Sequence, residues 1–333
     1  MPSADTLRDA SATEGPALFE HASADVHAYC AGLDRWDLVY DQLSPGTFRG
    51  SLTAIRFPRL EIFREATTRK TRQCGTLGPD SFTIGLPLSE TAVTRCNGAT
   101  ISGPDLFLIS IDAEIELFTP DDFELWGLSA SAATIEALAA DLGMPWPTHY
   151  AGRMQGARAT PGALARVKGL LLLAQEALRV RRDLGPATLA MRSLEDSLLA
   201  EVLNLAIASE PIAPSQRERR RTVDRARELM LSVTGKPMTL LDVCREVGAS
   251  PRKLAYCFRD QLGVTPGTYW KVIRLNRARK DLLDSAPEGT DIYSVAARHG
   301  FWHFSQFSQD YKRHFVERPS ETVRKARSRR ASL

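Results

Sequence analysis

The side chains with the clearest chemistry lie in two short segments near the C-terminal end of the chain. Arg252 and Tyr256 are four residues apart, so a helix would place them on one side, one turn apart. An arginine can donate two hydrogen bonds to guanine in the major groove of DNA, and a tyrosine can contact a base or donate to a phosphate. In the other segment Gln309 can bind adenine through its donor and its acceptor, while Lys312 and Arg313 suit phosphates. These residue types fit the recognition of duplex DNA.

Alternatives stay open for two of these side chains. Arg252 could touch phosphate alone, and Tyr256 could be an ordinary surface-packing residue.

Both segments belong to one pattern that occurs twice. Each copy reads as a short apolar helix, a glycine turn and a second helix with an apolar stripe, which is typical of a helix-turn-helix. The leading glycines, Gly248 and Gly300, are 52 residues apart, whereas the later positions are 53 apart, so the second turn contains one extra residue. A duplicated motif predicts two contacts on DNA. The later positions are Leu254, Tyr256, Phe258, Gly263 and Pro266, matched by Phe307, Gln309, Tyr311, Val316 and Pro319.

Elements that must position the two segments can be predicted from spacing and cap residues. A helix from Arg217 leads to a supporting helix over Leu240–Val247, which Gly248 ends because glycine readily adopts the left-handed conformation. Ser250 can cap the helix that follows. A long helix over Thr268–Leu283 joins the copies, and about 15 residues span roughly 22 Å at the helical rise. This spacing predicts two recognition helices on one face of the duplex, near one DNA turn apart.

Apolar stripes predict which side chains of the two recognition helices face outward. In the first copy the stripe is Leu254, Phe258 and Leu262. In the second, over residues 303–315, it is Phe304, Phe307, Tyr311 and Phe315. The remaining positions are the candidates for groove contacts: Arg252, Lys253, Tyr256 and Arg259 in the first copy, and Ser305, Gln306, Gln309, Lys312 and Arg313 in the second.

Charge is distributed unevenly along the chain of 333 residues. Residues 1–210 contain 18 Lys and Arg against 27 Asp and Glu, whereas residues 211–333 contain 25 against 13. The net charge of the first part is therefore −9 and that of the second +12. A basic part beside an acidic part indicates that only the C-terminal part meets a polyanion.

Several classes of protein are disfavoured by composition. No run approaches the roughly 18 apolar residues that a membrane span needs, and the first 15 residues do not resemble a signal peptide, so we expect a cytoplasmic location. The five cysteines are scattered without a Cys-x-x-Cys, which favours reduced thiols. His299 and His303 lack carboxylate or cysteine partners at a suitable spacing, so we expect neither metal nor cofactor.

The N-terminal two-thirds divides into regions of different texture. Residues 1–35 lack periodicity and are expected to be partly disordered, and residues 36–130 show short strands separated by Gly, Pro, Asn and Asp, typical of a small barrel or jelly roll. Apolar residues at helical spacing fill residues 131–208. Their clearest stripe, through Leu198, Val202 and Leu205, could pack in a homodimer, which is the favoured reading, or against its own chain. Two prolines predict that residues 209–216 are a linker. Residues 328–333 are expected to be a basic tail.

The C-terminal motifs resemble the AraC/XylS family of bacterial transcriptional regulators. The resemblance covers residues 217–327 and is most specific at Gly300-Phe301, Ser305, Phe307 and Tyr311-Lys312, followed by Pro319 and Arg324. Ser250, Arg252, Leu254 and Phe258, then Gly263, Pro266 and Tyr269, fit as well. Three positions depart from the family pattern: Cys244 replaces an alanine, Tyr256 an arginine and Val316 a turn glycine.

The resemblance implies a cupin-like N-terminal sensor over residues 36–130, a helical dimerisation segment over residues 131–208 and an all-α DNA-binding domain over residues 217–327. It implies a regulator that binds promoter or operator DNA, responds to a small-molecule effector and activates transcription by recruiting RNA polymerase. In the alternative the barrel binds a partner protein instead of a metabolite. An enzyme fused to the DNA-binding part is disfavoured, because no histidine lies between His27 and His149 to form the cluster that cupin enzymes use.

Overall fold

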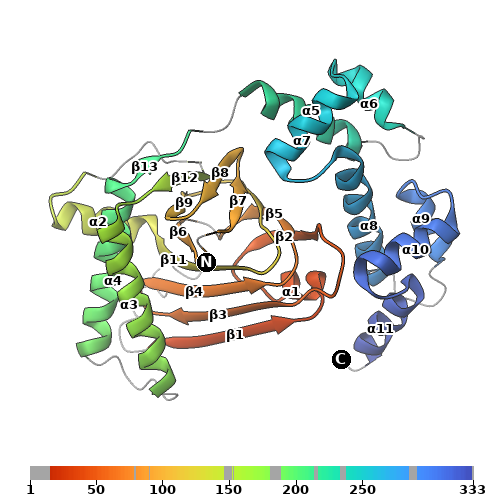
Figure 1. The fold of residues 1–333 in the computed structure, drawn as a ribbon. Helices are drawn as coiled ribbons and strands as arrows, with labels where there is room; N and C mark the ends of the chain where they lie inside the picture. Colours follow the sequence, from red (N-terminus) through yellow and green to blue (C-terminus); the bar gives the residue numbers. More distant parts are fainter. Residues whose placement is uncertain are drawn as a thin grey trace, which may run out of the picture.

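The N-terminal part of the chain is a two-sheet β structure, and the C-terminal part is helical (Figure 1). This fold class was predicted from the sequence and is confirmed, although the strands form two open antiparallel sheets instead of a closed barrel. The computed structural model describes residues 16–331 except 79, 90, 146–151, 153, 181–188, 214–216, 233–237 and 285–290.

The larger sheet has eight strands in the order β1-β3-β4-β11-β6-β9-β12-β13, and the smaller has five in the order β2-β5-β10-β7-β8. The larger comprises β1 (Ala17–Ser23), β3 (Gly50–Arg56), β4 (Leu60–Thr67), β6 (Ser81–Pro87), β9 (Asp105–Ile109), β11 (Phe123–Ser131), β12 (Met154–Arg158) and β13 (Glu210–Pro211). The smaller comprises β2 (Asp37–Gln42), β5 (Thr71–Thr76), β7 (Val93–Cys96), β8 (Ala99–Ser102) and β10 (Ile115–Phe118).

The two sheets pack face to face because alternate side chains of both point into one core. Leu52 and Phe63 from the larger sheet meet Tyr40 and Leu117 from the smaller one in this core. It also contains Tyr29 of α1 (Val26–Ala31), whose hydroxyl donates to the buried Glu65 at 3.0 Å. Burial raises the pKa of Glu65, and the hydroxyls of Tyr29 and Tyr40 are its hydrogen-bond partners.

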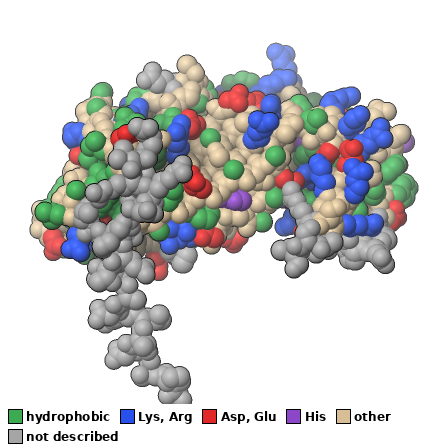
Figure 2. Space-filling model, turned by 90° about the horizontal axis from the view of Figure 1, so that it is seen from below, with side chains coloured by type: hydrophobic (Ala, Val, Ile, Leu, Met, Phe, Trp, Pro, Cys, Tyr) green, Lys and Arg blue, Asp and Glu red, His purple; other side chains and the backbone are tan. Residues whose placement is uncertain are grey.

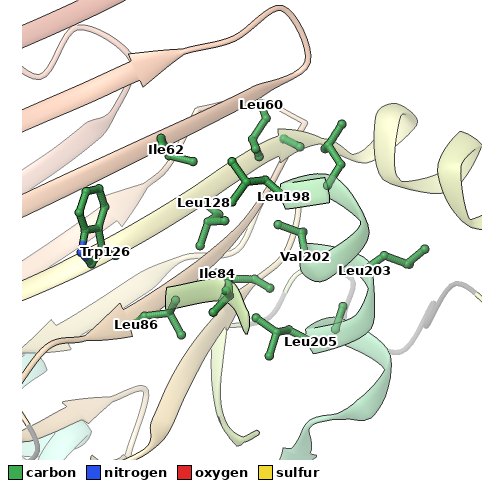
Figure 3. Close-up of a cluster of buried hydrophobic side chains, with 14 of the residues drawn as sticks. Leu60, Ile62, Ile84, Leu86, Trp126, Leu128, Leu198, Val202, Leu203 and Leu205 are labelled. Carbon is green, nitrogen blue, oxygen red and sulfur yellow. The ribbon is translucent and has the colours of Figure 1, made fainter. Parts of the chain in front are cut away.

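The other face of the larger sheet is covered by three helices: α2 (Ala132–Asp141), α3 (Pro161–Val180) and α4 (Leu189–Ala208). Figure 3 shows Leu198, Val202 and Leu205 of α4 directed at strand side chains such as Ile84 and Leu128. The stripe predicted for a dimer is thus buried within its own chain, which is the second of the two alternatives. The sequence could not separate these alternatives because both bury the same apolar side chains.

Ordered structure begins earlier and extends further than the predicted boundaries. β1 and α1 lie within the segment expected to be partly disordered, whose first 15 residues fall outside the described part. β12 and β13 add strands from the predicted helical segment and the linker, and the amide of Ile212 donates to the carbonyl of Gly156 at 2.8 Å. Sheet membership depends on pairing with distant segments, which local pattern does not reveal.

Among the described residues the C-terminal domain has seven helices, of which the first six agree closely with the predicted elements and the last was not predicted. They are α5 (Arg217–Ser232), α6 (Leu240–Val247), α7 (Pro251–Leu262), α8 (Pro266–Asp284), α9 (Ile292–Arg298), α10 (Phe304–Phe315) and α11 (Pro319–Ala331). None of the helices in the described residues has the length and hydrophobicity that crossing a membrane requires.

Cap residues explain why these helices begin and end where they do. Thr239 and Asp242 form a reciprocal capping box at the start of α6, and Ser250 accepts from the amide of Lys253 at the start of α7. Gly248 ends α6 with φ +67°, as predicted. Val316 ends α10 with φ +60°, although a β-branched residue strongly disfavours the left-handed region.

The N-terminal domain packs against α8, the helix that joins the two motifs. Leu43 and Phe118 enter the apolar core of the first motif, together with Trp270 and Ile273 of α8. Beside them the buried Asn276 forms two hydrogen bonds with the backbone of Gln42, at 3.0 and 2.9 Å. The sequence analysis did not foresee this packing between domains.

His314 of α10 extends the same contact to the second motif. Its Nε2 lies 2.9 Å from the carbonyl oxygen of Gln42, and its own carbonyl accepts from the amide of Gly46 at 2.9 Å and from the side chain of Gln42 at 3.2 Å. Each of these polar groups therefore has a partner in the other domain.

Two buried arginines of the helical domain form ion pairs across the same boundary. Arg279 of α8 bonds Asp25 and Glu317, at 2.5 and 2.6 Å. Burial raises the pKa of Asp25, but the hydrogen bond and charge of Arg279 outweigh it and hold that pKa at about 2. Arg227 of α5 bonds Glu116 of β10 at 2.7 Å, and Glu116 also accepts from Arg72. Removing one member of such a pair leaves a buried charge without its counterion.

Substituting Val316 with glycine is expected to stabilise the protein. Val316 is 58% exposed, so the change removes backbone strain while losing little burial. The strain costs about 1 to 2 kcal/mol, and the extra freedom of glycine in the unfolded chain offsets part of it, which leaves about 0.5 to 1 kcal/mol. Urea unfolding followed by circular dichroism measures the change.

The matched control is Gly248→Val, which places the same side chain at a similar positive φ where no atom lies within 4 Å of the new Cβ. This variant should lose about 1 to 2 kcal/mol. A less stable Val316→Gly protein would contradict the strain argument.

The stability of the protein should also fall on acidification below pH 7. Burial lowers the pKa of His314 from 6.5 to about 4. The unfolded chain therefore takes up this proton near pH 6.5, whereas the folded chain takes it up only near pH 4, so protonation favours unfolding between these values. We expect His314 to account for a loss on the order of 2 kcal/mol between pH 7 and pH 5.

The comparison variant is His314→Gln, whose amide can still donate to the Gln42 carbonyl but does not titrate. Its urea midpoint should fall less than that of the wild type between pH 7 and pH 5. Equal losses in the two proteins would show that His314 is not the group responsible.

Candidate nucleic-acid interface

The second helix of the first motif, α7, presents the predicted face to solvent. Leu254, Phe258 and Leu262 are buried in the core shared with α5, α6 and α8. The predicted groove residues Arg252, Lys253, Tyr256 and Arg259 are all exposed. These side chains are exposed with the N-terminal domain in place, so that domain does not cover them.

Two neighbours from α5 modify this face. Lys253 Nζ lies 2.9 Å from Glu218, and this hydrogen bond raises the pKa of the lysine and lowers that of the glutamate. The guanidinium of Arg219 lies 4.6 Å from the centre of the Tyr256 ring, a cation–π contact, and Tyr256 as a whole is 53% exposed. A phosphate that binds Lys253 must compete with Glu218, whereas Arg219 adds a cation beside Tyr256 that the sequence analysis did not include.

The second helix of the second motif, α10, is built in the same way with one exception. Phe307, Tyr311 and Phe315 are buried as predicted, but Phe304 is 40% exposed, so its assignment to the stripe was wrong. Phe304 is the first residue of the helix, where no preceding turn can cover it. The predicted groove residues Ser305, Gln306, Gln309, Lys312 and Arg313 are all exposed.

Asp310 organises part of this face and was missed by the sequence analysis. Its side chain is buried and receives hydrogen bonds from Gln306 and Lys271, both at 3.2 Å, while Arg313 lies 3.6 Å away. Gln306 and Arg313 are thereby held by a neighbour on the same helix. Their spacing of four and three residues from Asp310 is the signal that could have revealed this arrangement.

The N-terminal domain contacts the first recognition helix at its end and leaves its outward face open. Arg95 of β7 donates to the carbonyl of Asp260 at 2.8 Å, beside Gly263, which ends α7. Figure 2 shows Lys and Arg side chains gathered over the helical domain, on the right of the view. This face, together with the net charge of +12 over residues 211–333, is suited to a polyanion.

His299, one of the two histidines considered for a metal site, pairs with a carboxylate that the sequence analysis did not include, because its Nε2 lies 2.9 Å from Asp281. Across the described residues no group of three or more His, Cys, Asp or Glu side chains is arranged to hold a metal ion.

Comparisons with known proteins agree on the C-terminal part. A helix-turn-helix domain family matches residues 243–325. The chain is 42% identical over 89 residues to the probable thc operon regulatory protein of Rhodococcus erythropolis, covering 27% of each chain. It is 33% identical over 78 residues to the XylDLEGF operon transcriptional activator of Pseudomonas putida, covering 23% of this chain and 24% of the relative. The chain thus matches about a quarter of the length of these relatives.

Solved structures with a likeness to the chain include a probable AraC family transcriptional regulator from Rhodopseudomonas palustris. It is 28% identical, and the match covers 32% of this chain and 97% of the other, with a TM-score of 0.29. The AraC-like transcriptional activator CuxR is 15% identical, with 84% and 98% covered and a TM-score of 0.42.

Both sequence relatives are named as regulators of operons, and the helix-turn-helix domain family covers the segment in which both motifs lie. Within that segment the structure shows two capped supporting helices, two recognition helices with exposed polar faces, and the single helix that joins them. Residues 243–325 are thus a helix-turn-helix domain of the AraC/XylS type, as the resemblance of the sequence predicted.

Proposed function

We propose that the chain is a sequence-specific transcriptional regulator that binds promoter DNA through α7 and α10. The observation behind this proposal is that both recognition helices expose side chains able to read base edges, while α8 is shared by the cores of both motifs. A shared helix fixes the spacing of the two contacts, which specific binding on one face of DNA requires. We propose in addition that residues 36–130 form the sensor domain and residues 217–327 the DNA-binding domain.

We infer activation rather than repression, because the Pseudomonas putida relative is named as an operon activator. Activation would include a contact with RNA polymerase. A homodimer remains part of the proposal, although its surface differs from the α4 stripe, which is buried within the chain.

DNA binding is tested by selecting genomic fragments with the full-length protein at about 150 mM salt, where binding through phosphates alone is weakened. On a selected fragment, Arg252→Ala and Gln309→Ala should each cost about 1 to 3 kcal/mol of specific binding, because each removes a contact to a base. Dissociation constants from electrophoretic mobility shift or fluorescence anisotropy measure these losses.

Lys312→Ala serves as the matched control, because a lost phosphate contact should weaken binding to the selected fragment and to random DNA alike. The base-contact assignment would be refuted if Arg252→Ala and Gln309→Ala also weakened both DNAs equally.

We propose further that a small-molecule effector binds between the two domains. The interior of the sandwich is filled, with a remaining cavity of about 40 Å³, so the expected effector site inside a barrel has no room there. For the sheets themselves, this filling favours the alternative in which they bind a partner protein.

The proposed effector site is a different one. A cleft of about 640 Å³, a size suited to a small ligand, opens between α1 and β2 on one side and α8 and α11 on the other.

Mostly apolar side chains line this cleft, among them Leu33, Trp36 and Leu283, and the charged side chains of Lys280, Asp37 and Asp284 also lie there. Such a lining suits a mostly apolar molecule, whose acidic group would pair with Lys280. A ligand here touches both domains, so it can bind one domain arrangement better than another and so shift promoter affinity.

A thermal-shift screen with aliphatic and aromatic carboxylates is expected to raise the Tm of the wild type. Lys280→Met, which keeps the length and apolar character of the side chain, should reduce that rise. A ligand that stabilises both proteins equally would place the effector elsewhere, and a screen without any stabilising acid would count against the cleft.

A further inference from the structure

Three aromatic side chains around the start of α10 are exposed. The exposed fractions are 55% for Tyr293, 51% for Trp302 and 40% for Phe304. Together with Tyr256 they are the exposed aromatic side chains among the large hydrophobic residues of the described chain, and all four lie in the two helix-turn-helix motifs. Apolar surface concentrated in this way marks an interaction site more often than chance exposure does.

Two of the three rings pack together, and Trp302 and Phe304 occupy the end of the helix where groove contacts begin. The Phe304 ring lies 6.2 Å from that of Tyr293 and 6.2 Å from that of the buried Phe307. Trp302 is two residues before the first residue of α10. In a helix-turn-helix the N-terminal residues of the recognition helix contact base edges. Trp302 and Phe304 therefore lie where the helix would first meet bases.

The polar surface next to these rings favours DNA over a basic or neutral partner. The outward side chains further along α10 contain amides, a hydroxyl and two cations, and no carboxylate. Asp310, the acid of this helix, is buried and paired with Lys271. An apolar end on an otherwise cationic, hydrogen-bonding face matches one feature of the major groove, the C5-methyl group of thymine among polar base edges.

We propose that Trp302 and Phe304 contact thymine C5-methyl groups in the half of the operator that α10 reads. This inference depends on the proposed DNA-binding function. The first motif has Ala249 and Pro251 at the same positions relative to its recognition helix, so methyl recognition is confined to one half-site. The two halves of the operator therefore differ, with thymines that contribute to binding on the α10 side.

The test uses full-length protein and a DNA fragment that it binds specifically, in which each thymine is replaced in turn by deoxyuridine. This replacement removes the methyl group and keeps the base pair. Loss of one buried methyl-sized group, worth about 0.8 kcal/mol, should raise the dissociation constant about fourfold at one or two positions and leave the others unchanged.

Trp302→Ser and Phe304→Ser should bind the unmodified fragment more weakly and lose the sensitivity to deoxyuridine at those same positions. Two variants are needed because Phe304 also packs against the core, and thermal unfolding verifies that each is folded. Leu18→Ser, which removes an exposed apolar side chain from β1, is the control and should keep the full deoxyuridine effect.

Three results would overturn the proposal. If the wild type binds the fragment specifically but no deoxyuridine has an effect, the methyl contact is absent while the proposed function stands. If the variants keep DNA affinity and deoxyuridine sensitivity but reduce transcription by purified RNA polymerase, the rings contact a protein. If no fragment is bound specifically, both the inference and the proposed function fail.

Discussion

The packing of α8 between three partners is the constraint on which the rest of the structure depends. Its side chains enter the core of the first motif through Tyr269 and Ile273 and the core of the second through Leu275 and Leu282. The N-terminal domain bonds the same helix at Asn276. A shift of α8 would disturb both recognition helices and the domain contact at once, so the three units cannot adjust independently.

This constraint gives the N-terminal domain a physical route to the DNA-binding surface. Contacts from the N-terminal domain reach α5, beside the first motif, at Arg227 and α8 at Arg279. Each arginine meets a carboxylate of that domain in a partly or fully buried setting. Separating the domains would break these ion pairs. An arginine or carboxylate that then stayed buried without its partner would cost free energy, because it would also lack hydration. A ligand in the cleft beside α8 acts on a boundary that is already closely packed.

Local signals in the sequence were sufficient for most of the helical domain, although they did not predict α11 or the exposure of Phe304. The bounds of α6 and the caps at Gly248 and Ser250 were predicted because glycine conformation and side-chain capping act within a few residues. The outward faces of α7 and α10 followed from periodicity. Asp310, the domain contacts and the extra strands of the larger sheet were not predicted, because each depends on neighbours that only tertiary packing brings together.

The two motifs have the same order of helices and turns but differ at solvent-exposed positions. The first ends its recognition helix with Gly263, whereas the second uses Val316 at nearly the same backbone angles. The first begins that helix with Pro251 after a serine cap, whereas the second begins it with Phe304 after His303, whose side chain makes no cap hydrogen bond. Buried positions such as Leu254 and Phe307 keep their apolar character because packing penalises change there. Divergence limited to exposed positions is what two copies would show if each keeps the fold and reads a different half of one site.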